Sequence, residues 1–495
     1  MRIQEEAVKP KGRGMFFLTS LVVCFFAFLI SKNVTLSPFF LILATLIGGA
    51  YLLLRGVSRP EIITYALVAY LPFSKELAGD FGGWAMAFNF TNLLMTFVII
   101  VWLTGKFSSD EPLWLSTPLN FPILLFMGIG FISLARGSYS ASGEWFFSII
   151  EYKRWITPIF MFFLVLNTVK DRQTIKNLVV IMIIVTTIVG LMAIYDYMNV
   201  GATASLDRSR IGGIADQPNM LAAFFNYYMF LPFGFFLMNM KKFKCWLLNI
   251  PFLLQFRGVM VTFSRGGYMA FALGLYAITF FRSKFLFLLL LLATFIVFLN
   301  PVLLPAGIRY RMGQTFENRT SYVDTGEVRE ADLDRSAADR VEVWKGALQM
   351  IKEQPFFGVG YGLFEPMIQY YWSGERKIDA HNTYLIIAAE MGIPALLVFL
   401  LIVLMTLGQT YGLYKTTADP FSKALALGFI GGIFGLFMSN MFGSRLDSQE
   451  VSSYFWILAA LVMRLKILDK KDAEIGRHGD TETLEHGKAV ARGEK

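Results

Sequence analysis

Runs of roughly 17–25 predominantly apolar residues recur along almost the whole chain, and this is the length that a helix needs to cross a bilayer. The 495 residues are 55% hydrophobic and 16% charged, whereas a globular domain has about 25% charged residues. No single soluble domain accommodates so many unbroken apolar segments together with 49 Phe and 23 Met. The pattern therefore predicts an all-α polytopic membrane protein.

The apolar runs predict about 12–14 transmembrane helices. Their centres fall near residues 23, 45, 67, 97, 127, 162, 187, 228, 254, 273, 294, 397, 431 and 459. The first run follows a basic, polar segment and lacks a small-residue cleavage site, so it indicates an uncleaved helix rather than a signal peptide.

Basic residues predict the orientation. With a cytoplasmic N-terminus, more than half of the 45 Lys and Arg residues fall inside, and half of the others lie in one long loop that the positive-inside rule does not count. Both termini are therefore expected in the cytoplasm. The expected parts are a cytoplasmic N-terminus (1–14), about eleven spans (15–305), a large outer loop (306–382), about three spans (383–467) and a charged cytoplasmic tail (468–495), which is expected to be disordered.

The large outer loop is expected to contain one amphipathic helix, Ser336–Gln354. Its apolar residues repeat at helical spacing, and Pro355 with the glycine-rich stretch Gly358–Gly362 ends it. Such a helix is expected to lie on the membrane surface as a roof over a site. Acidic and basic residues nearly balance in this loop, which argues against a nucleic-acid partner.

Ionisable side chains near a membrane are costly, which makes them functional candidates. On the outer side the candidates are Arg208, Arg210, Arg265, Arg340, His381, the adjacent Asn382 and, two turns deeper, Glu390. Arginine binds phosphate bidentately and stays charged. Histidine titrates near neutrality and accepts a proton from a hydroxyl group. The set predicts a diphosphate site with a base beside it.

Each candidate also has a structural explanation. An Arg at a helix end can extend to the lipid headgroups, and Asn382 can cap the helix that follows it. Glu390 either fixes the tautomer of His381 or pairs within the bundle. Asp332-Leu-Asp334 fits a metal-dependent D-x-D pattern, but a solvated charged face explains it better.

No metal or cofactor is expected. Cys24 and Cys245 lie in apolar runs, as small core residues do. No three or four ligands have metal-site spacing, and Gly358–Gly362 lacks the strand that a dinucleotide site requires. A substrate already activated by a lipid diphosphate would explain both absences.

Seven short motifs occur in a specific order between residues 205 and 410. They are Arg210-Ile-Gly-Gly213, Gln217-Pro-Asn219, Ser264-Arg-Gly-Gly267, Arg340-x-x-x-Trp344, Pro355-Phe-Phe-Gly-Val-Gly360, Ala380-His-Asn382 and Glu390-Met-Gly-Ile-Pro394. Together they resemble the O-antigen ligase and O-antigen polymerase superfamily of bacterial inner membranes.

This resemblance implies a GT-C-like fold with its active site on the periplasmic side. Members transfer a glycan from undecaprenyl diphosphate to an acceptor hydroxyl without metal or nucleotide. The boundary Arg of the family corresponds to Arg265, the outer-loop Arg to Arg210 with Arg208 beside it, and the loop His to His381. The hypothesis is a single inverting displacement in which Arg265 and Arg210 hold the diphosphate, His381 orients or deprotonates the hydroxyl, and Arg340 lies over the site.

Three functions remain open at this point. A ligase would use the lipid A core as acceptor. An O-antigen or exopolysaccharide polymerase would join lipid-linked repeat units by the same chemistry, with a chain-length regulator as a partner. The third function is transport of a lipid-linked sugar or anion. Transporters typically have helices broken at mid-membrane or an inverted repeat, and the sequence indicates neither.

Overall fold

A computed structural model describes residues 61–77, 90–107, 112, 114–140, 145–200, 210–304, 309, 319–322, 328–331, 335–372, 379–443 and 448–491. The helices are α3 (Glu61–Tyr70), α4 (Ser74–Leu77), α5 (Phe90–Phe107), α6 (Asn120–Ser140), α7 (Trp145–Thr168), α8 (Arg172–Asn199), α9 (Pro218–Tyr228), α10 (Phe230–Met238), α11 (Asn249–Val261), α12 (Arg265–Arg282), α13 (Lys284–Leu299), α15 (Arg335–Glu353), α16 (Phe364–Ile368), α17 (Thr383–Thr416), α18 (Pro420–Ser439) and α19 (Gln449–Ala491). Short 3-10 turns are η1 (Leu71–Phe73), η3 (Gly213–Ala215), η4 (Phe243–Leu248) and η5 (Pro301–Leu303). A small antiparallel hairpin pairs β1 (Arg319–Tyr322) with β2 (Val328–Ala331).

The all-α polytopic expectation is confirmed. Six segments of the described chain are long and apolar enough to cross a membrane: Asn120–Gly137, Arg172–Asn199, Pro218–Met238, Thr383–Thr416, Pro420–Ser439 and Gln449–Glu474. The expected N-terminal segment and the span centres near 23 and 45 lie outside the described residues, whereas every expected centre from 67 to 459 falls within a helix. The total of about 12–14 spans stays a prediction.

Several spans begin where a short polar side chain caps the first turn. The Asp171 carboxylate accepts a hydrogen bond from the Thr174 N–H at 2.8 Å, at the start of α8. The Asp419 carboxylate accepts from the Ser422 N–H at 3.0 Å, at the start of α18. Such caps satisfy backbone donors that the helix itself leaves unpaired. The polar residues between apolar runs therefore determine where the spans start.

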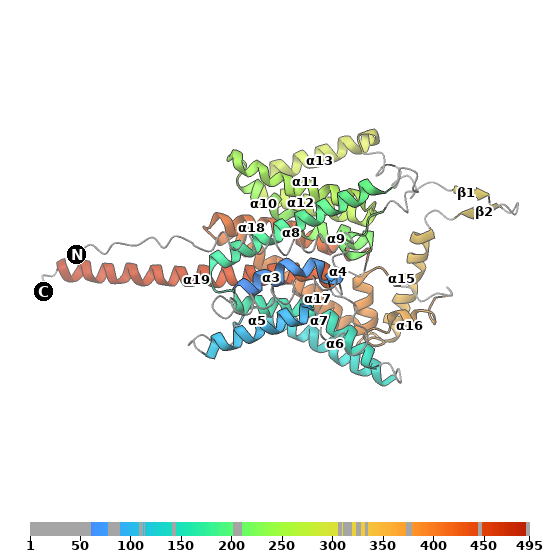
Figure 1. The fold of residues 1–495 in the computed structure, drawn as a ribbon, viewed down its shortest axis with the longest axis horizontal. Helices are drawn as coiled ribbons and strands as arrows, with labels where there is room; N and C mark the ends of the chain where they lie inside the picture. The colour runs from blue at the N-terminus through green and yellow to red at the C-terminus, as the bar shows by residue number, and fades with distance from the viewer. Residues whose placement is uncertain are drawn as a thin grey trace, which may run out of the picture.

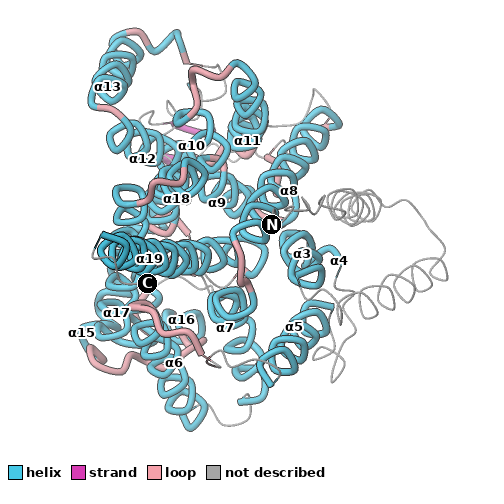
Figure 2. The backbone as a smooth tube through the Cα atoms, turned by 90° about the vertical axis from the view of Figure 1, so that its left-hand side faces the viewer, coloured by secondary structure: helices cyan, strands magenta, loops and turns pink. Residues whose placement is uncertain are grey.

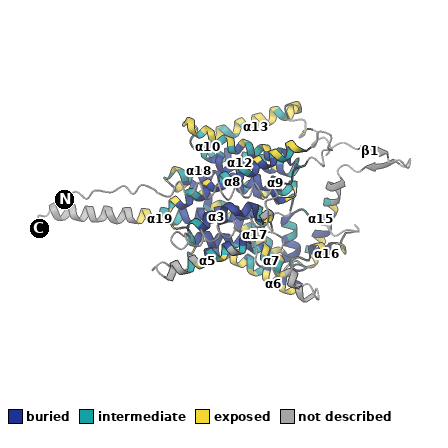
Figure 3. Cartoon of the chain, in the orientation of Figure 1, coloured by how far each residue is buried: buried dark blue, intermediate teal, exposed yellow. Residues whose placement is uncertain are grey.

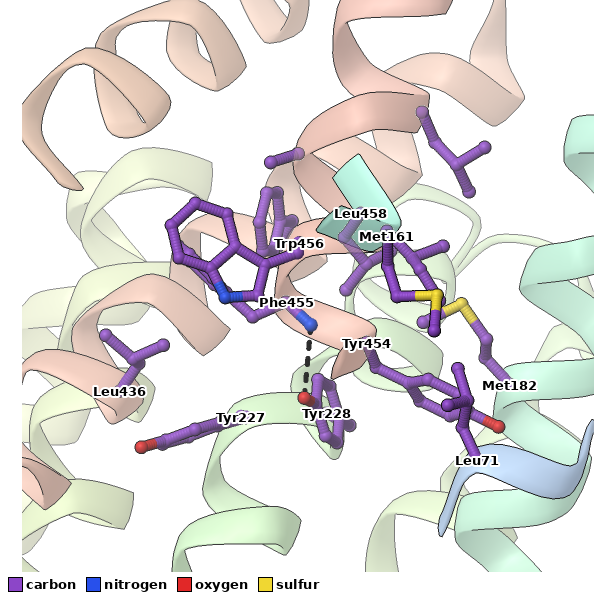
Figure 4. Packing of buried hydrophobic residues seen from close by; sticks show 14 of the residues in the cluster. Leu71, Met161, Met182, Tyr227, Tyr228, Leu436, Tyr454, Phe455, Trp456 and Leu458 are labelled. Carbon is purple, nitrogen blue, oxygen red and sulfur yellow. Dashed lines mark hydrogen bonds between the residues drawn. The ribbon is translucent and has the colours of Figure 1, made fainter. Parts of the chain in front are cut away.

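The centre of the bundle is built around α19, with α7, α9, α17 and α18 beside it (Figures 1 and 2). Buried residues concentrate there, as Figure 3 shows. In Figure 4 the buried Tyr228 hydroxyl accepts a hydrogen bond from the Phe455 N–H at 3.1 Å, which ties α9 to α19. By contrast, α13 lies at the periphery and has no buried residue. Its apolar side chains are therefore positioned to face lipid.

The elements of the outer loop and the C-terminal part of α19 lie at opposite ends of the molecule. Figure 1 shows α15, α16 and the hairpin at one end of the bundle, whereas α19 extends beyond the other end. The expected loop helix Ser336–Gln354 appears as α15. The expectation of a disordered tail after residue 468 is wrong as far as Ala491, because α19 continues to that residue. Forming the first turn is the unfavourable step of helix formation, and the buried part of α19 already provides that turn. The Ala, Glu and Lys residues of the tail favour continuation of the helix.

Candidate functional site

The N-terminal ends of α12 and α17 are joined by the turn that follows α18. Thr383, the first residue of α17, donates from its backbone N–H to the Asn440 carbonyl at 2.9 Å and from its hydroxyl to the Gly443 carbonyl at 2.9 Å. In the same turn, Phe442 packs so closely on Gly266 that a Cβ at Gly266 would lie 2.8 Å from its own Cβ. The segments that carry Arg265 and His381 therefore share one end of the bundle.

Arg210 is fixed against the α11–α12 turn. Its Nε donates to the Thr262 carbonyl at 3.1 Å, and its Nη2 donates to the Asn219 side-chain oxygen at 3.0 Å. Thr262 lies three residues before Arg265, so the structure brings the two predicted arginines to the same turn. Arg208 lies outside the described residues, as do Asp332 and Asp334.

The Ser264-Arg-Gly-Gly267 motif is a helix start with no space for larger residues. The Ser264 hydroxyl accepts from the Gly267 N–H at 3.2 Å and caps α12, which places Arg265 at its first position. A Cβ at Gly267 would lie 2.7 Å from that of Ala222 on α9. The two glycines thus permit α9 and the α18 turn to approach Arg265 closely.

His381 is held by a residue that the sequence did not indicate. The His381 N–H donates to Asp379 Oδ1 at 3.1 Å, and its Nδ1 lies 3.2 Å from Asp379 Oδ2. The His381 backbone has a φ of +49°, and its side chain is 40% exposed. An Asp two residues before a left-handed turn residue is the signal of an Asx turn, and that signal could have identified Asp379.

The roof helix α15 contacts this loop through Trp344. The indole N–H of Trp344 donates to the Ala380 carbonyl at 2.8 Å, directly beside His381. Arg340 lies one turn earlier on the same helix. Burial lowers the pKa of its guanidinium, and the Asp379 carboxylate opposes that shift. Its Nε is buried and has no hydrogen-bond partner among the described residues.

Asn382 and Glu390 have structural roles. The Asn382 side-chain oxygen accepts from the N–H groups of Tyr384 at 3.0 Å and Leu385 at 3.2 Å, and so caps α17. The buried Glu390 carboxylate accepts from the Phe364 N–H at 3.0 Å, at the start of α16. Fixing the His381 tautomer was one of the two roles considered for Glu390. The residue that contacts His381 Nδ1 is Asp379 instead.

Two of the sequence motifs form one unit at a break in α17. Gly392 has φ +86° and ψ 167°, and Pro394 lacks an N–H. The loop before α16 supplies the missing partners: Val359 N–H donates to the Ala389 carbonyl at 2.8 Å and Gly360 N–H to the Glu390 carbonyl at 3.1 Å. The expectation that no span is broken is therefore wrong for α17, although backbone of the outer loop fills this break.

The geometry suits an anion next to a base. Three helices, α9, α12 and α17, begin around the contacts described above. Helix N-termini carry unpaired N–H groups and a partial positive charge that favour phosphate. Arg210 and Arg265 add full charges, and the His381–Asp379 pair supplies a proton acceptor. Within the described part of the chain, no three His, Cys, Asp or Glu side chains gather as metal ligands.

The comparison with protein families agrees with this geometry. Residues 250–400 match the family model described as O-antigen ligase. The matched segment contains Arg265, Arg340, His381 and Glu390, and the predicted resemblance is confirmed. No curated protein matches the chain. The chain is a membrane protein in which residues 250–400 are similar to the O-antigen ligase family, and this similarity indicates a glycosyltransferase-like ligase or polymerase.

Proposed function

We propose that this protein transfers a glycan from undecaprenyl diphosphate to an acceptor hydroxyl at the periplasmic face of a bacterial inner membrane. The O-antigen ligase domain supports the class of reaction. The C-terminal end of α19 would lie in the cytoplasm, since it and the outer loop lie at opposite ends of the bundle. A ligase that uses the lipid A core is the first candidate, and a polymerase of lipid-linked repeats is the second.

The proposed reaction is a single inverting displacement. The acceptor oxygen bonds to the anomeric carbon of the donor sugar while the bond from that carbon to the phosphate oxygen breaks. His381 takes the hydroxyl proton, and undecaprenyl diphosphate leaves with the bonding electron pair. Arg210 and Arg265 would neutralise the charge that develops on the leaving phosphate, and such preorganised donors are most effective where charge appears in the transition state.

One observation carries this proposal. The turn after α18 contacts both Thr383, two residues after His381, and Gly266, directly after Arg265. A base and an anion site on unrelated faces could not act on one glycosidic bond. The turn that contacts both segments therefore supports a site in which the two groups act together.

The test is a transfer assay with purified full-length protein and an undecaprenyl-diphosphate-linked repeat unit, with and without EDTA. The acceptor is lipid A core, a further repeat unit, or none. A product only with lipid A core identifies a ligase, and a ladder from repeat units alone identifies a polymerase. Transfer that EDTA abolishes would contradict the metal-independent mechanism. Donor binding without transfer to either acceptor would contradict the proposal and favour transport.

A further inference from the structure

We propose that Asp379 is the positioning residue that fixes the tautomer of His381, so that Nε2 is the proton acceptor in transfer. This inference rests on the proposed function for its kinetic consequence. Its structural part, the tautomer, can be tested by itself.

The two side chains make two contacts that fix both the loop and the ring. Asp379 Oδ1 accepts from the His381 backbone N–H at 3.1 Å, and Asp379 Oδ2 lies 3.2 Å from the ring Nδ1. The side chain of Asp379 is only 26% exposed. A carboxylate that is partly withdrawn from water and bound twice to one residue has little freedom to turn away.

The chemistry of these atoms determines where the ring proton lies. An ionised carboxylate is only an acceptor, so the facing Nδ1 must carry a hydrogen to approach it favourably. In a neutral imidazole the other nitrogen then has a free lone pair. Nε2 is therefore the atom that can accept a hydroxyl proton, and the carboxylate stabilises the imidazolium that forms.

The roof helix secures the same arrangement from the other side. Trp344 on α15 donates to the Ala380 carbonyl, between Asp379 and His381, at 2.8 Å. Arg340, one turn before Trp344 on α15, interacts electrostatically with the Asp379 carboxylate. A positive neighbour favours the ionised carboxylate, which the contact to Nδ1 requires. The loop helix thus contributes to positioning His381.

The substitution D379N reverses the polarity of the contact while keeping its shape. The Asn oxygen can still accept from the His381 N–H, as in an Asx turn. Its NH₂ group, now facing Nδ1, would favour a lone pair there and move the ring proton to Nε2. His381 would keep its position, but its Nε2 would carry a hydrogen and could not accept the hydroxyl proton.

The tautomer can be read by ¹⁵N NMR because the chain has only three histidines. His478 and His486 lie in the far part of α19 and can both be replaced with Gln, which leaves His381 as the only signal. The spectra are read at a pH where the ring is neutral, and there the Nδ1–H form is expected with Asp379 and the Nε2–H form with D379N. A His381 that is mainly Nε2–H in the otherwise unchanged protein would overturn the proposal, even if D379N failed to fold.

The kinetic test uses the transfer assay with full-length protein. D379N is expected to lower kcat roughly 100-fold, in the range of general-base catalysis, with KM for the lipid donor changed less than about threefold. D379E should recover at least part of kcat.

The matched control is E342Q, since Glu342 is an exposed carboxylate on α15 whose partner is Lys345. This substitution should leave kcat unchanged. Equal kcat for D379N and the unchanged protein would refute the kinetic role. Absence of transfer in every variant, with the expected tautomers, would instead count against the proposed function.

Discussion

Gly392→Ala should destabilise the protein by about 2.5–7.5 kcal/mol, from backbone strain, overpacking and a lost hydrogen bond. At φ +86° an alanine pays roughly 1–3 kcal/mol of backbone strain. The new Cβ would lie 2.3 Å from the Phe356 carbonyl oxygen, and such overpacking costs roughly 1–3 kcal/mol. To relieve this clash, the loop that contains Phe356 would have to move away from α17. That movement would break the hydrogen bond from the Ile393 N–H to the Pro355 carbonyl, which is 2.7 Å long. That bond adds about 0.5–1.5 kcal/mol.

The assay is unfolding in detergent micelles, followed by intrinsic tryptophan fluorescence. Gly408→Ala is the control, because Gly408 lies in the helical part of the same α17 and a Cβ there would meet no atom within 4 Å. An alanine at a helical glycine is expected to gain roughly 0.5–1 kcal/mol. If Gly392→Ala unfolded at the same temperature as Gly408→Ala, the explanation of the break in α17 would be refuted.

Three further substitutions test the roof helix and the anion site. Trp344→Phe removes the hydrogen bond to Ala380 together with one of the two indole rings. Transfer should fall about tenfold, and stability should fall by about 0.5–1.5 kcal/mol for the hydrogen bond and further for the lost ring contacts. An unchanged transfer rate would contradict a role for α15 in positioning the loop. Arg265→Ala should lower kcat roughly 100- to 1000-fold, as loss of a transition-state donor does. Arg265→Lys, which retains the charge but not the planar fork, should fall in between, and equal rates for both variants would count against bidentate binding.

Much of the fold could be predicted because the bilayer imposes a simple rule on length. A span needs about 20 apolar residues whatever its neighbours are, so centres from residue 67 to 459 all fall in helices. The roof helix was likewise indicated by local periodicity, because Val341, Trp344, Leu348 and Ile351 recur at helical spacing. The face that it buries is a different one, since Val343, Ala347 and Met350 are buried whereas Val341 and Leu348 are exposed.

The unpredicted features depend on contacts between distant segments or on a choice between two partners. Glu390 meets Phe364 across 26 residues, and no local pattern specifies that pairing. Asp379 lies only two residues from His381, but the sequence does not specify whether its carboxylate or that of Glu390 contacts the ring. The helical tail was missed because composition describes the segment alone, whereas here it continues a buried helix.

In the proposed mechanism the arginines hold the donor while His381 removes the proton. These two roles are separated by comparing donor binding and transfer by His381→Gln in lipid nanodiscs, with the lipid-linked repeat unit as ligand. We expect a donor Kd within about threefold of the unchanged protein and a transfer rate reduced roughly 100- to 10,000-fold, the contribution of a general base. Transfer at the unchanged rate by His381→Gln would contradict the role of His381 as the base.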